Sequence, residues 1–387
     1  MAGDKRARPK LNANQQVEAM KGKGIRFVLM DELEAERFLR ERNFFFKVKA
    51  FEKVFDRYEN PERELFGQYL NLDFAYLVEL SRLDNALRFC VMETALDIEH
   101  FMKVQMNCSM MDDAGCDAYG IVDQYVAFDA SSKLARIARE NDRDVLKLLE
   151  CLCEGLAVLD QAELSTSKEA RMEAIRLLDE TKDEIEETLG GLDLRHIEKS
   201  ISRLSTSQYS RRLAGKYGSL GKMAYWNFFE LATFGDIIGL YKYYYFEFSQ
   251  GKDQRAKRVK QLLFPVRALR NAAAHNSCLL NTLRDRLSKP IGAIAKMLIN
   301  EYKMDRELVT LTRRAPLIHD FSALLMCYDV LVSSEHSRSV CAKRLRVLSE
   351  RLSRNRQYFE KQVEVSKGLE MLVALCETFA VRLTANV

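Results

Sequence analysis

The segment from Leu72 to Met106 constrains the fold more than any other part of the chain. It reads LDFAYLVELSRLDNALRFCVMETALDIEHFMKVQM and contains neither Gly nor Pro. Residues with helical spacing recur along its first half, namely Leu72, Ala75, Tyr76, Glu79, Leu80, Leu83 and Leu87. This periodicity of three and four residues predicts an amphipathic helix, either one long helix or a packed hairpin of two. The whole chain supports this reading, because only 17 Gly and 5 Pro occur in 387 residues. We therefore predict an all-α fold.

Composition excludes several classes of protein. The chain is 47% hydrophobic, enough for the core of one large or two modest domains. No apolar run is long enough to cross a bilayer, and no signal-peptide region follows MAGDKRARPK, so we expect a soluble, cytoplasmic protein without a membrane partner. The nine cysteines are scattered without a C-x-x-C pair, and only five histidines are present. We therefore expect neither a metal site nor a cofactor.

Local signals place several element boundaries. NANQQVEAMKGKG predicts a short helix opened by Asn12 or Asn14 and closed by glycine, and Asp31 is a predicted cap for DELEAERFLRER. The pattern of residues 43–55, NFFFKVKAFEKVF, fits a strand or a helix. STSQYSRRLAGKYGSLGK, residues 205–222, looks like a basic linker. It leads into MAYWNFFELATFGDIIGLYKYYYF, residues 223–246, which is apolar on nearly every side and is therefore expected to be central.

Charge is distributed unevenly along the chain. Residues 160–198 hold twelve acids and five bases, a net charge of −7. Residues 203–270 hold thirteen bases and four acids, a net of +9, and residues 338–361 hold eight bases and two acids, a net of +6. The two basic segments favour a polyanionic partner, although charge alone does not distinguish RNA from another anion.

Residues 264–281, FPVRALRNAAAHNSCLLN, place polar groups inside a helical pattern. Pro265 stands where a first helical residue is expected. Arg267, Asn271 and His275 are four residues apart and share one face of the predicted helix, whereas Arg270 lies about 140° around the axis from His275. Arg270 and His275 therefore converge only if the arginine reaches round, if the helix is distorted, or if a second copy of the chain contributes.

Histidine and arginine together suffice for metal-free RNA cleavage. Histidine gains and loses a proton near neutral pH, and arginine grips a phosphate through two hydrogen bonds. RNA supplies its own nucleophile, the 2′-hydroxyl. The alternative is a polar layer in which both side chains bond neighbouring helices. Spacing alone favours that alternative, because R-x-x-x-x-H is short and common by chance.

The motif and the segments around it resemble a known family, and this resemblance favours RNA cleavage over the polar layer. RNAAAHN resembles the R-x4–6-H motif of HEPN domains. Together with the 72–103 segment and YWNFFELATFGDIIGLY, in that order, it is similar to bacterial abortive-infection (Abi) proteins of the AbiD/AbiF type over most of residues 8–290. The resemblance implies a HEPN-like helical bundle in residues 61–290, with N-terminal helices in 1–60, C-terminal helices in 291–387 and an inserted acidic lobe at about 130–200.

The same resemblance implies a function and a set of residues. It implies a metal-independent endoribonuclease toxin of an abortive-infection or toxin–antitoxin system, active as a homodimer, with Arg270 and His275 catalytic and Asn271 beside them. Its partners would be target RNA and a small structured antitoxin RNA. Glu230, Thr233 and Gly235 match a further family motif to which we assign no role.

The basic segments and the motif helix supply the expected RNA contacts. These are Arg267, Asn276, Arg211, Arg212, Lys216, Lys257, Arg258 and Lys260. Two alternatives stay open: a catalytically inactive RNA-binding HEPN scaffold, and a helical protein-interaction module that senses a phage component.

Overall fold

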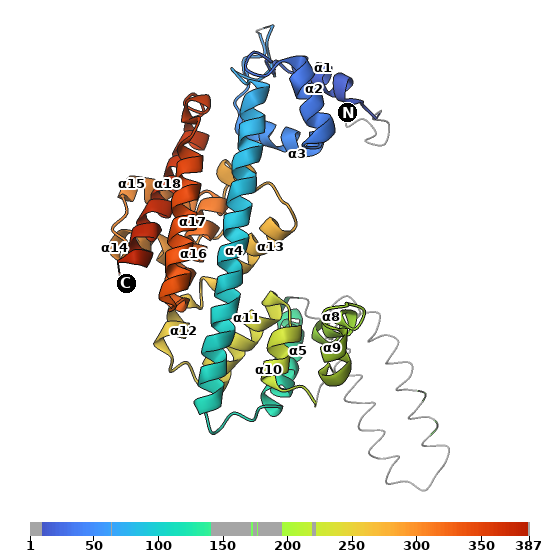
Figure 1. The fold of residues 1–387 in the computed structure, drawn as a ribbon, viewed down its shortest axis with the longest axis vertical. Helices are drawn as coiled ribbons and strands as arrows, with labels where there is room; N and C mark the ends of the chain where they lie inside the picture. Colours follow the sequence, from blue (N-terminus) through green and yellow to red (C-terminus); the bar gives the residue numbers. More distant parts are fainter. Residues whose placement is uncertain are drawn as a thin grey trace. The chain divides into compact units, whose positions relative to one another are not determined.

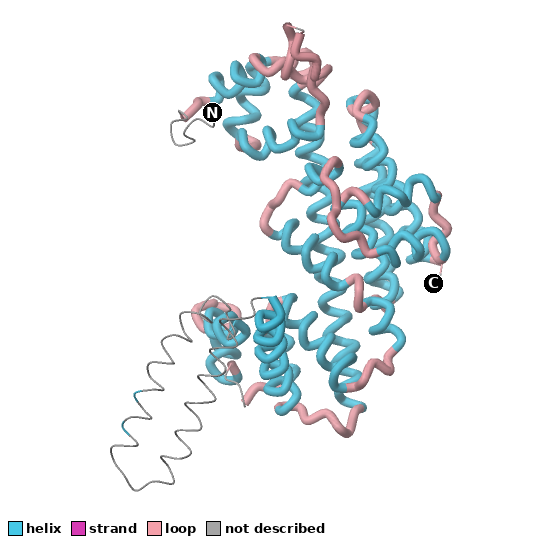
Figure 2. The backbone as a smooth tube through the Cα atoms, turned by 180° about the vertical axis from the view of Figure 1, so that it is seen from behind, coloured by secondary structure: helices cyan, strands magenta, loops and turns pink. Residues whose placement is uncertain are grey.

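The chain folds into helices. The structure is a computed structural model that describes residues 10–62, 64–140, 172, 176, 196–218 and 222–385. Within these residues it contains α-, 3-10 and π-helices and two isolated β-bridges, but no strand (Figures 1 and 2). The prediction of an all-α fold is confirmed. Most of the predicted acidic lobe, at about 130–200, lies outside the described residues.

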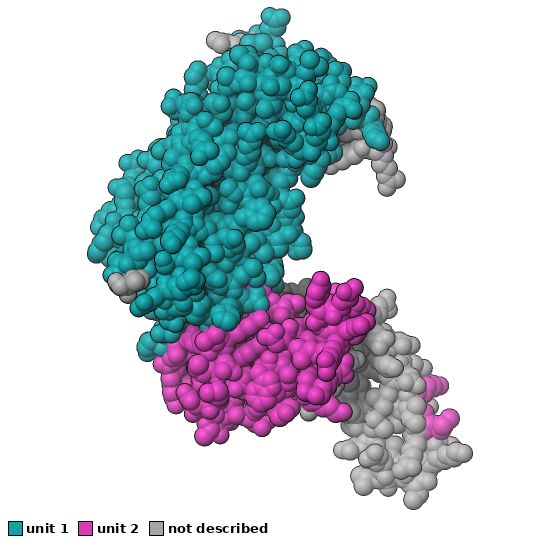
Figure 3. All heavy atoms as spheres, in the orientation of Figure 1, with its two compact units in different colours: residues 1–101, 254–387 teal, residues 102–253 magenta. Residues whose placement is uncertain are grey.

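The chain divides into two compact units (Figure 3). Unit 1 consists of residues 1–101 and 254–387, and unit 2 of residues 102–253. Helix α4 (Phe74–Asp112) supplies residues to both units. It runs unbroken for 39 residues, so the long-helix alternative for the 72–106 segment is the correct one. The three sequence segments expected as domains, 1–60, 61–290 and 291–387, stay a prediction.

The first helices of unit 1 begin where the sequence signals place them. Asn12 caps α1 (Ala13–Lys21) in a capping box with Gln15, and Gly22 ends the helix. Asp31 caps α2 (Glu32–Glu41) by accepting the amide of Glu34. The ambiguous segment 43–55 is helical: α3 (Phe45–Lys49) continues into a 3-10 helix, η2 (Ala50–Val54).

The core of unit 1 surrounds α16 (Pro316–Leu331). Twelve of its sixteen residues are buried, among them Phe321, Leu324 and Tyr328, so this helix is apolar on nearly every side. The helices that pack against it are α12 (Gln254–Val259), α13 (Leu263–Ala274), η5 (Leu279–Leu283), α14 (Gly292–Asn300), η6 (Thr310–Arg313) and α18 (Val363–Thr384). The start of α17 (Glu335–Ser353) bonds to its end, and unit 1 also contains α15 (Arg306–Val309) and η7 (Arg356–Tyr358).

Three arginines of the second basic segment, residues 338–361, form ion pairs within the chain. Arg351 and Arg344 of α17 bind Glu79 and Glu93 of α4, each at 2.6 Å, and Arg338 binds Asp329 at 2.8 Å. These three arginines hold helices of unit 1 together. The expected use of residues 338–361 as a surface for a polyanion is therefore weakened, since part of their charge is neutralised within the chain.

Unit 2 contains α5 (Gly120–Glu140), α8 (His196–Leu204), α9 (Arg211–Tyr217), α10 (Tyr225–Leu231), α11 (Phe234–Lys242) and the π-helix η4 (Tyr243–Phe248). One expectation needs correction, because the predicted linker 205–222 contains α9. The apolar segment 223–246 is divided, since Ala232 is extended and Thr233 starts α11 as a new cap.

No helix in the parts of the chain that the structure describes combines the length and apolar character needed to cross a membrane.

Candidate functional site

Helix α13 carries the arginine–histidine motif and ends within it. The helix begins at Leu263, so Pro265 is its third residue rather than its first, a position whose amide needs no intrahelical partner. The helix ends at Ala274, and His275 is its C-cap. The prediction of a helix continuing to residue 281 is therefore wrong beyond Ala274.

The chain leaves α13 through a Schellman turn. Asn276 adopts a left-handed conformation with φ 58°. Its amide donates to the carbonyl of Ala273, and the amide of Ser277 donates to the carbonyl of Ala272. Asparagine is one of the few residues other than glycine that tolerate this conformation, which explains why the helix stops here.

Arg270 is held at the side of α13. Its side chain is 28% exposed, its Nη1 donates to Oδ1 of Asn271 at 3.2 Å, and its Nη2 lies 3.9 Å from Oε2 of Glu99 on α4. Asn271 therefore contacts Arg270, and the catalytic role that the resemblance implied for the two residues stays a prediction. Glu99 is a neighbour that the sequence did not indicate.

His275 faces solvent at the end of the helix. Its side chain is exposed, and no described residue forms a hydrogen bond or ion pair with its imidazole. The helix between Arg270 and His275 is regular, so the two residues are separated by about 140° around the axis and about 7.5 Å along it. The regular geometry excludes a distorted helix as the way in which Arg270 and His275 converge. An arginine that reaches round the helix and a second copy of the chain both stay open.

A buried polar cluster lies under this end of the helix. Lys47 of α3 is only 6% exposed, and its Nζ donates to the backbone carbonyl and to Oδ1 of Asn276, the latter at 2.8 Å. Asp84 of α4 is fully buried; its Oδ1 accepts the amide of Leu280 at 2.9 Å, and its Oδ2 accepts Nε of Arg88 at 3.1 Å.

Burial shapes the electrostatics of the cluster. It raises the pKa of Asp84 above its usual value, an effect opposed by the Leu280 amide and by the charges of Lys47 and Arg88. Burial likewise raises the pKa of the neighbouring Cys278 thiol. The sequence patterns did not indicate Lys47 or Asp84 as site residues. The one available signal for Lys47 was a lysine among aromatic and aliphatic residues in FFFKVKAF.

The predicted RNA contacts fall into separate groups. Arg211, Arg212 and Lys216 are exposed on α9 in unit 2, whereas Lys257, Arg258 and Lys260 are exposed at α12 in unit 1. Arg258 forms an exposed ion pair with Glu301 at 2.6 Å.

Two predicted contacts lie on the motif helix and its turn. Arg267 is exposed on α13, and the Oδ1 atom of Asn276 is already occupied by Lys47. The contacts of all these residues with RNA stay a prediction.

The motif without an assigned role has a structural component. Thr233 caps α11, forming a reciprocal capping box with Asp236. Glu230 is exposed at the end of α10, and Gly235 lies in the first turn of α11. Tyr241, Tyr244 and Tyr245 are buried, whereas Trp226 is 46% exposed. The three tyrosines are therefore core residues, and Trp226 is partly open to solvent.

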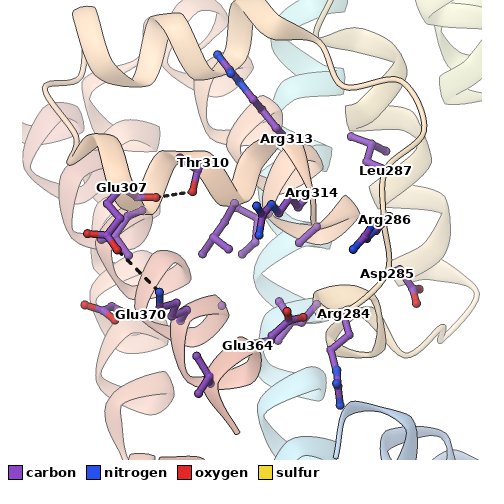
Figure 4. A pocket seen from close by; sticks show the side chains of 18 of the residues that line it. Arg284, Asp285, Arg286, Leu287, Glu307, Thr310, Arg313, Arg314, Glu364 and Glu370 are labelled. Carbon is purple, nitrogen blue, oxygen red and sulfur yellow. Dashed lines mark hydrogen bonds and ion pairs between the residues drawn. The ribbon is translucent and has the colours of Figure 1, made fainter.

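A cavity of about 710 Å³ lies elsewhere in unit 1, between the loop after η5, the η6 region and the start of α18 (Figure 4). Arginines and carboxylates both line it. Arg284 is paired with Asp56 at 2.8 Å, and Lys367 lies 3.9 Å from Glu307. Because both signs of charge face the cavity, it offers no field of one sign to a polyanion. The Arg270–His275 region is the stronger candidate.

Across the described ranges, no three His, Cys, Asp or Glu residues gather in a way that could hold a metal ion.

Comparison with known proteins covers the same region. A family model described as Abi-like protein matches residues 37–281, which is more than half of the 387 residues. The match includes Lys47, Asp84 and the Arg270–His275 motif. No curated protein and no solved structure matched the chain in the corresponding comparisons.

Proposed function

The chain belongs to the Abi-like protein family, and from this premise we propose that it is a metal-independent endoribonuclease that acts as a toxin in abortive infection. Membership of the family suggests a role in abortive-infection defence against phage. The ribonuclease activity is our inference from the R-x4–6-H resemblance and from the site at the end of α13.

One observation carries the proposal: the histidine of the motif is exposed and has no side-chain partner among the described residues. A histidine that served the core would be buried and hydrogen-bonded, because an unsatisfied buried polar group is costly. Arg270 is also accessible, at 28% exposure, beside the amide of Asn271. Both groups are thus available to a substrate.

The chemistry follows from these two side chains. A basic imidazole accepts the proton of a 2′-hydroxyl, and the 2′-oxygen attacks the adjacent phosphorus. The bond from phosphorus to the 5′-oxygen breaks, and an imidazolium protonates the departing oxygen. The products are a 2′,3′-cyclic phosphate and a 5′-hydroxyl end. In this scheme His275 transfers protons, and Arg270 stabilises the charge that builds up on the phosphate oxygens.

An exposed apolar face supports a homodimer. Phe89 and Leu96 of α4 are 63% and 52% exposed and lie seven residues apart on one side of the helix. Glu99, three residues further along that side, contacts Arg270. A second copy that covered Phe89 and Leu96 would therefore lie near Arg270, which makes a site shared between two copies testable. Large exposed apolar side chains are typical of such interfaces.

Cleavage assays with matched variants test the proposal. We expect the purified protein to cut RNA in EDTA and to leave 2′,3′-cyclic phosphate ends, detectable by mass spectrometry. Arg270→Ala and His275→Ala should each lower cleavage at least 100-fold and abolish toxicity on expression. His336→Ala, which removes an exposed histidine of α17, should cleave like the unmodified protein.

Stability measurements separate catalysis from folding. Removing the exposed His275 imidazole should change the free energy of unfolding by less than about 0.5 kcal/mol. A His275→Ala chain that unfolds would instead assign the histidine to the core. Tight RNA binding without any cleavage would favour the inactive RNA-binding scaffold, and absence of both would favour a protein-interaction module.

A further inference from the structure

We propose that Lys47 is a positioning residue that, together with Asp84, holds the turn carrying His275 in place for catalysis. The inference rests on the proposed function for its catalytic consequence, but the structural device can be tested separately. Because the His275 imidazole has no side-chain partner among the described residues, its location depends on the backbone around residues 274–277.

That backbone has a conformation that needs support. Asn276 is left-handed, with φ 58°, a conformation that asparagine tolerates but that most residues with a side chain disfavour. The Schellman hydrogen bonds from Asn276 and Ser277 hold the turn from the helix side. From the other side Lys47 donates to both the carbonyl and Oδ1 of Asn276. One ammonium group therefore fixes both the peptide and the side chain of the residue that follows His275.

Burial makes this contact more than a surface ion pair. Lys47 is 6% exposed, and an ammonium in such a place is destabilising unless its donors and its charge are satisfied. Its donors reach Asn276, and the buried carboxylate of Asp84 provides nearby negative charge.

Asp84 secures the next part of the chain. Its Oδ1 accepts the amide of Leu280, and Arg88 binds its other oxygen. Buried groups of opposite charge thus hold residue 276, within the short link between α13 and η5, and residue 280, at the start of η5. Lys47 comes from α3 and Asp84 from α4, so two separate elements keep this link in one place.

The consequence for catalysis is a specific kinetic pattern. A displacement of about 1 Å in a catalytic group can cost about 100-fold in rate. Lys47 is buried and does not reach the substrate, so its loss should affect the chemical step rather than RNA binding. We expect kcat to fall while KM stays close to that of the unmodified protein.

Lys47→Met tests this, since methionine fills the space of the aliphatic stem but lacks the donors and the charge. We expect kcat to fall about 10- to 100-fold, with KM changed less than about threefold. Hydrogen exchange of residues 275–280 should accelerate, and the NMR signal of His275, assigned by its loss in His275→Ala, should shift or broaden. Lys49→Met, on the same helix, is the control and should leave all these readouts unchanged; an equal loss in this variant would overturn the proposal.

Asn276 provides a second test that does not depend on the folding of Lys47→Met. Glycine favours the left-handed conformation and keeps the carbonyl that Lys47 binds, whereas alanine disfavours that conformation. Asn276→Gly should therefore leave hydrogen exchange of residues 277–280 within about threefold of the unmodified protein, whereas Asn276→Ala should accelerate it at least tenfold. Equal exchange rates in these two variants would overturn the proposal.

The readouts distinguish failure of the positioning role from failure of the ribonuclease proposal. If the unmodified protein cuts no RNA, hydrogen exchange and the His275 signal still report whether Lys47 holds the turn. A folded Lys47→Met chain with unchanged exchange at residues 275–280 and an unchanged His275 signal would refute the positioning role, whatever the enzyme assay shows.

Discussion

At the scale of single residues, a position at the end of a helix decides what His275 can do. As the C-cap of α13 it lies where the backbone turns away, so its imidazole is exposed instead of packed between helices. Arg270, five residues earlier, keeps contact with Asn271 and Glu99. The same helix therefore carries one polar residue held by neighbours and one open to a substrate.

Close packing at another residue yields a stability prediction. A Cβ atom on Gly239 of α11 would lie 2.0 Å from the hydroxyl oxygen of Tyr125, whereas one on Gly215 of α9 would meet nothing within 4 Å. Gly239→Ala should destabilise the protein by about 1–3 kcal/mol, because Tyr125 is buried and must move. Gly215→Ala should stabilise it by about 0.5–1 kcal/mol through helix propensity. Urea unfolding of both variants measures the difference; a neutral Gly239→Ala would contradict the close approach of α11 to Tyr125.

At the scale of elements, α4 contacts several distant parts of unit 1. Arg351 and Arg344 tie α17 to it through Glu79 and Glu93, and Glu99 and Asp84 connect it to the motif helix and the turn beyond. A long helix suits this task because residues many turns apart keep a defined spacing.

The Glu79–Arg351 pair predicts a pH-dependent stability. Burial acts to raise the pKa of Glu79, but hydrogen bonds from Arg351 and Asn355 and the charge of Arg351 outweigh it and leave the pKa below its usual value of 4.5. An acid with a lowered pKa in the folded state stabilises above its unfolded pKa and loses that contribution as the pH falls. Glu79→Gln should therefore cost roughly 3 kcal/mol at pH 7, and the difference from the unmodified protein should shrink progressively below pH 4.5.

An exposed pair is the control for that measurement. Glu36 and Arg40 form an ion pair at 2.6 Å within α2, with Arg40 60% exposed. Glu36→Gln should cost less than about 0.5 kcal/mol at pH 7, because solvent screens such pairs. Chemical denaturation at a series of pH values compares both variants. If the difference in free energy of unfolding between Glu79→Gln and the unmodified protein stayed constant down to acid pH, Glu79 would contribute by its shape and not by its charge.

At the scale of the whole molecule, the basic groups of α9 and α12 should make RNA binding depend on salt. Each phosphate that a cation neutralises releases counterions, so the affinity should fall steeply between 50 and 200 mM salt. Arg212→Ala removes an exposed charge of α9. It should reduce the magnitude of the slope of log K, the RNA-binding constant, against log salt by about 1. Fluorescence anisotropy with labelled RNA measures both quantities. An affinity independent of salt would exclude a surface that binds the RNA backbone.

Mixing two inactive chains tests whether the site is shared. If Arg270 of one copy serves His275 of the other, an equal mixture of Arg270→Ala and His275→Ala chains should recover about a quarter of the normal cleavage. Half of the dimers are then mixed, and each mixed dimer holds one complete site. If a verified mixed dimer recovered no cleavage, the Arg270 and His275 of one site would come from the same chain.

The exposed apolar face of α4 permits an independent test of the dimer. Leu96→Glu should give a monomer by light scattering and should abolish cleavage, because it places a charge in the proposed interface. Val347→Glu, on the similarly exposed Val347 of α17, is the matched control and should stay dimeric. A Leu96→Glu chain that stayed dimeric would show that the dimer interface does not include Leu96.

The sequence by itself determined the features that depend on neighbouring residues. Apolar spacing in the 72–106 segment predicted helical structure, and Asn12 and Asp31 predicted the starts of α1 and α2, because caps and amphipathic faces are local properties. The order of the motifs also indicated the Abi-like family, which the match over residues 37–281 establishes.

Only the tertiary structure decided how the site is built. The pattern FPVRALRNAAAHNSCLLN does not reveal that the helix stops at Ala274, since the left-handed turn at Asn276 is supported by Lys47, 229 residues earlier in the chain. Likewise, nothing near Glu99 or Asp84 in the sequence shows that one meets Arg270 and the other the amide of Leu280. These contacts depend on how distant helices pack, and a one-dimensional periodicity specifies which face is apolar but not which partner covers it.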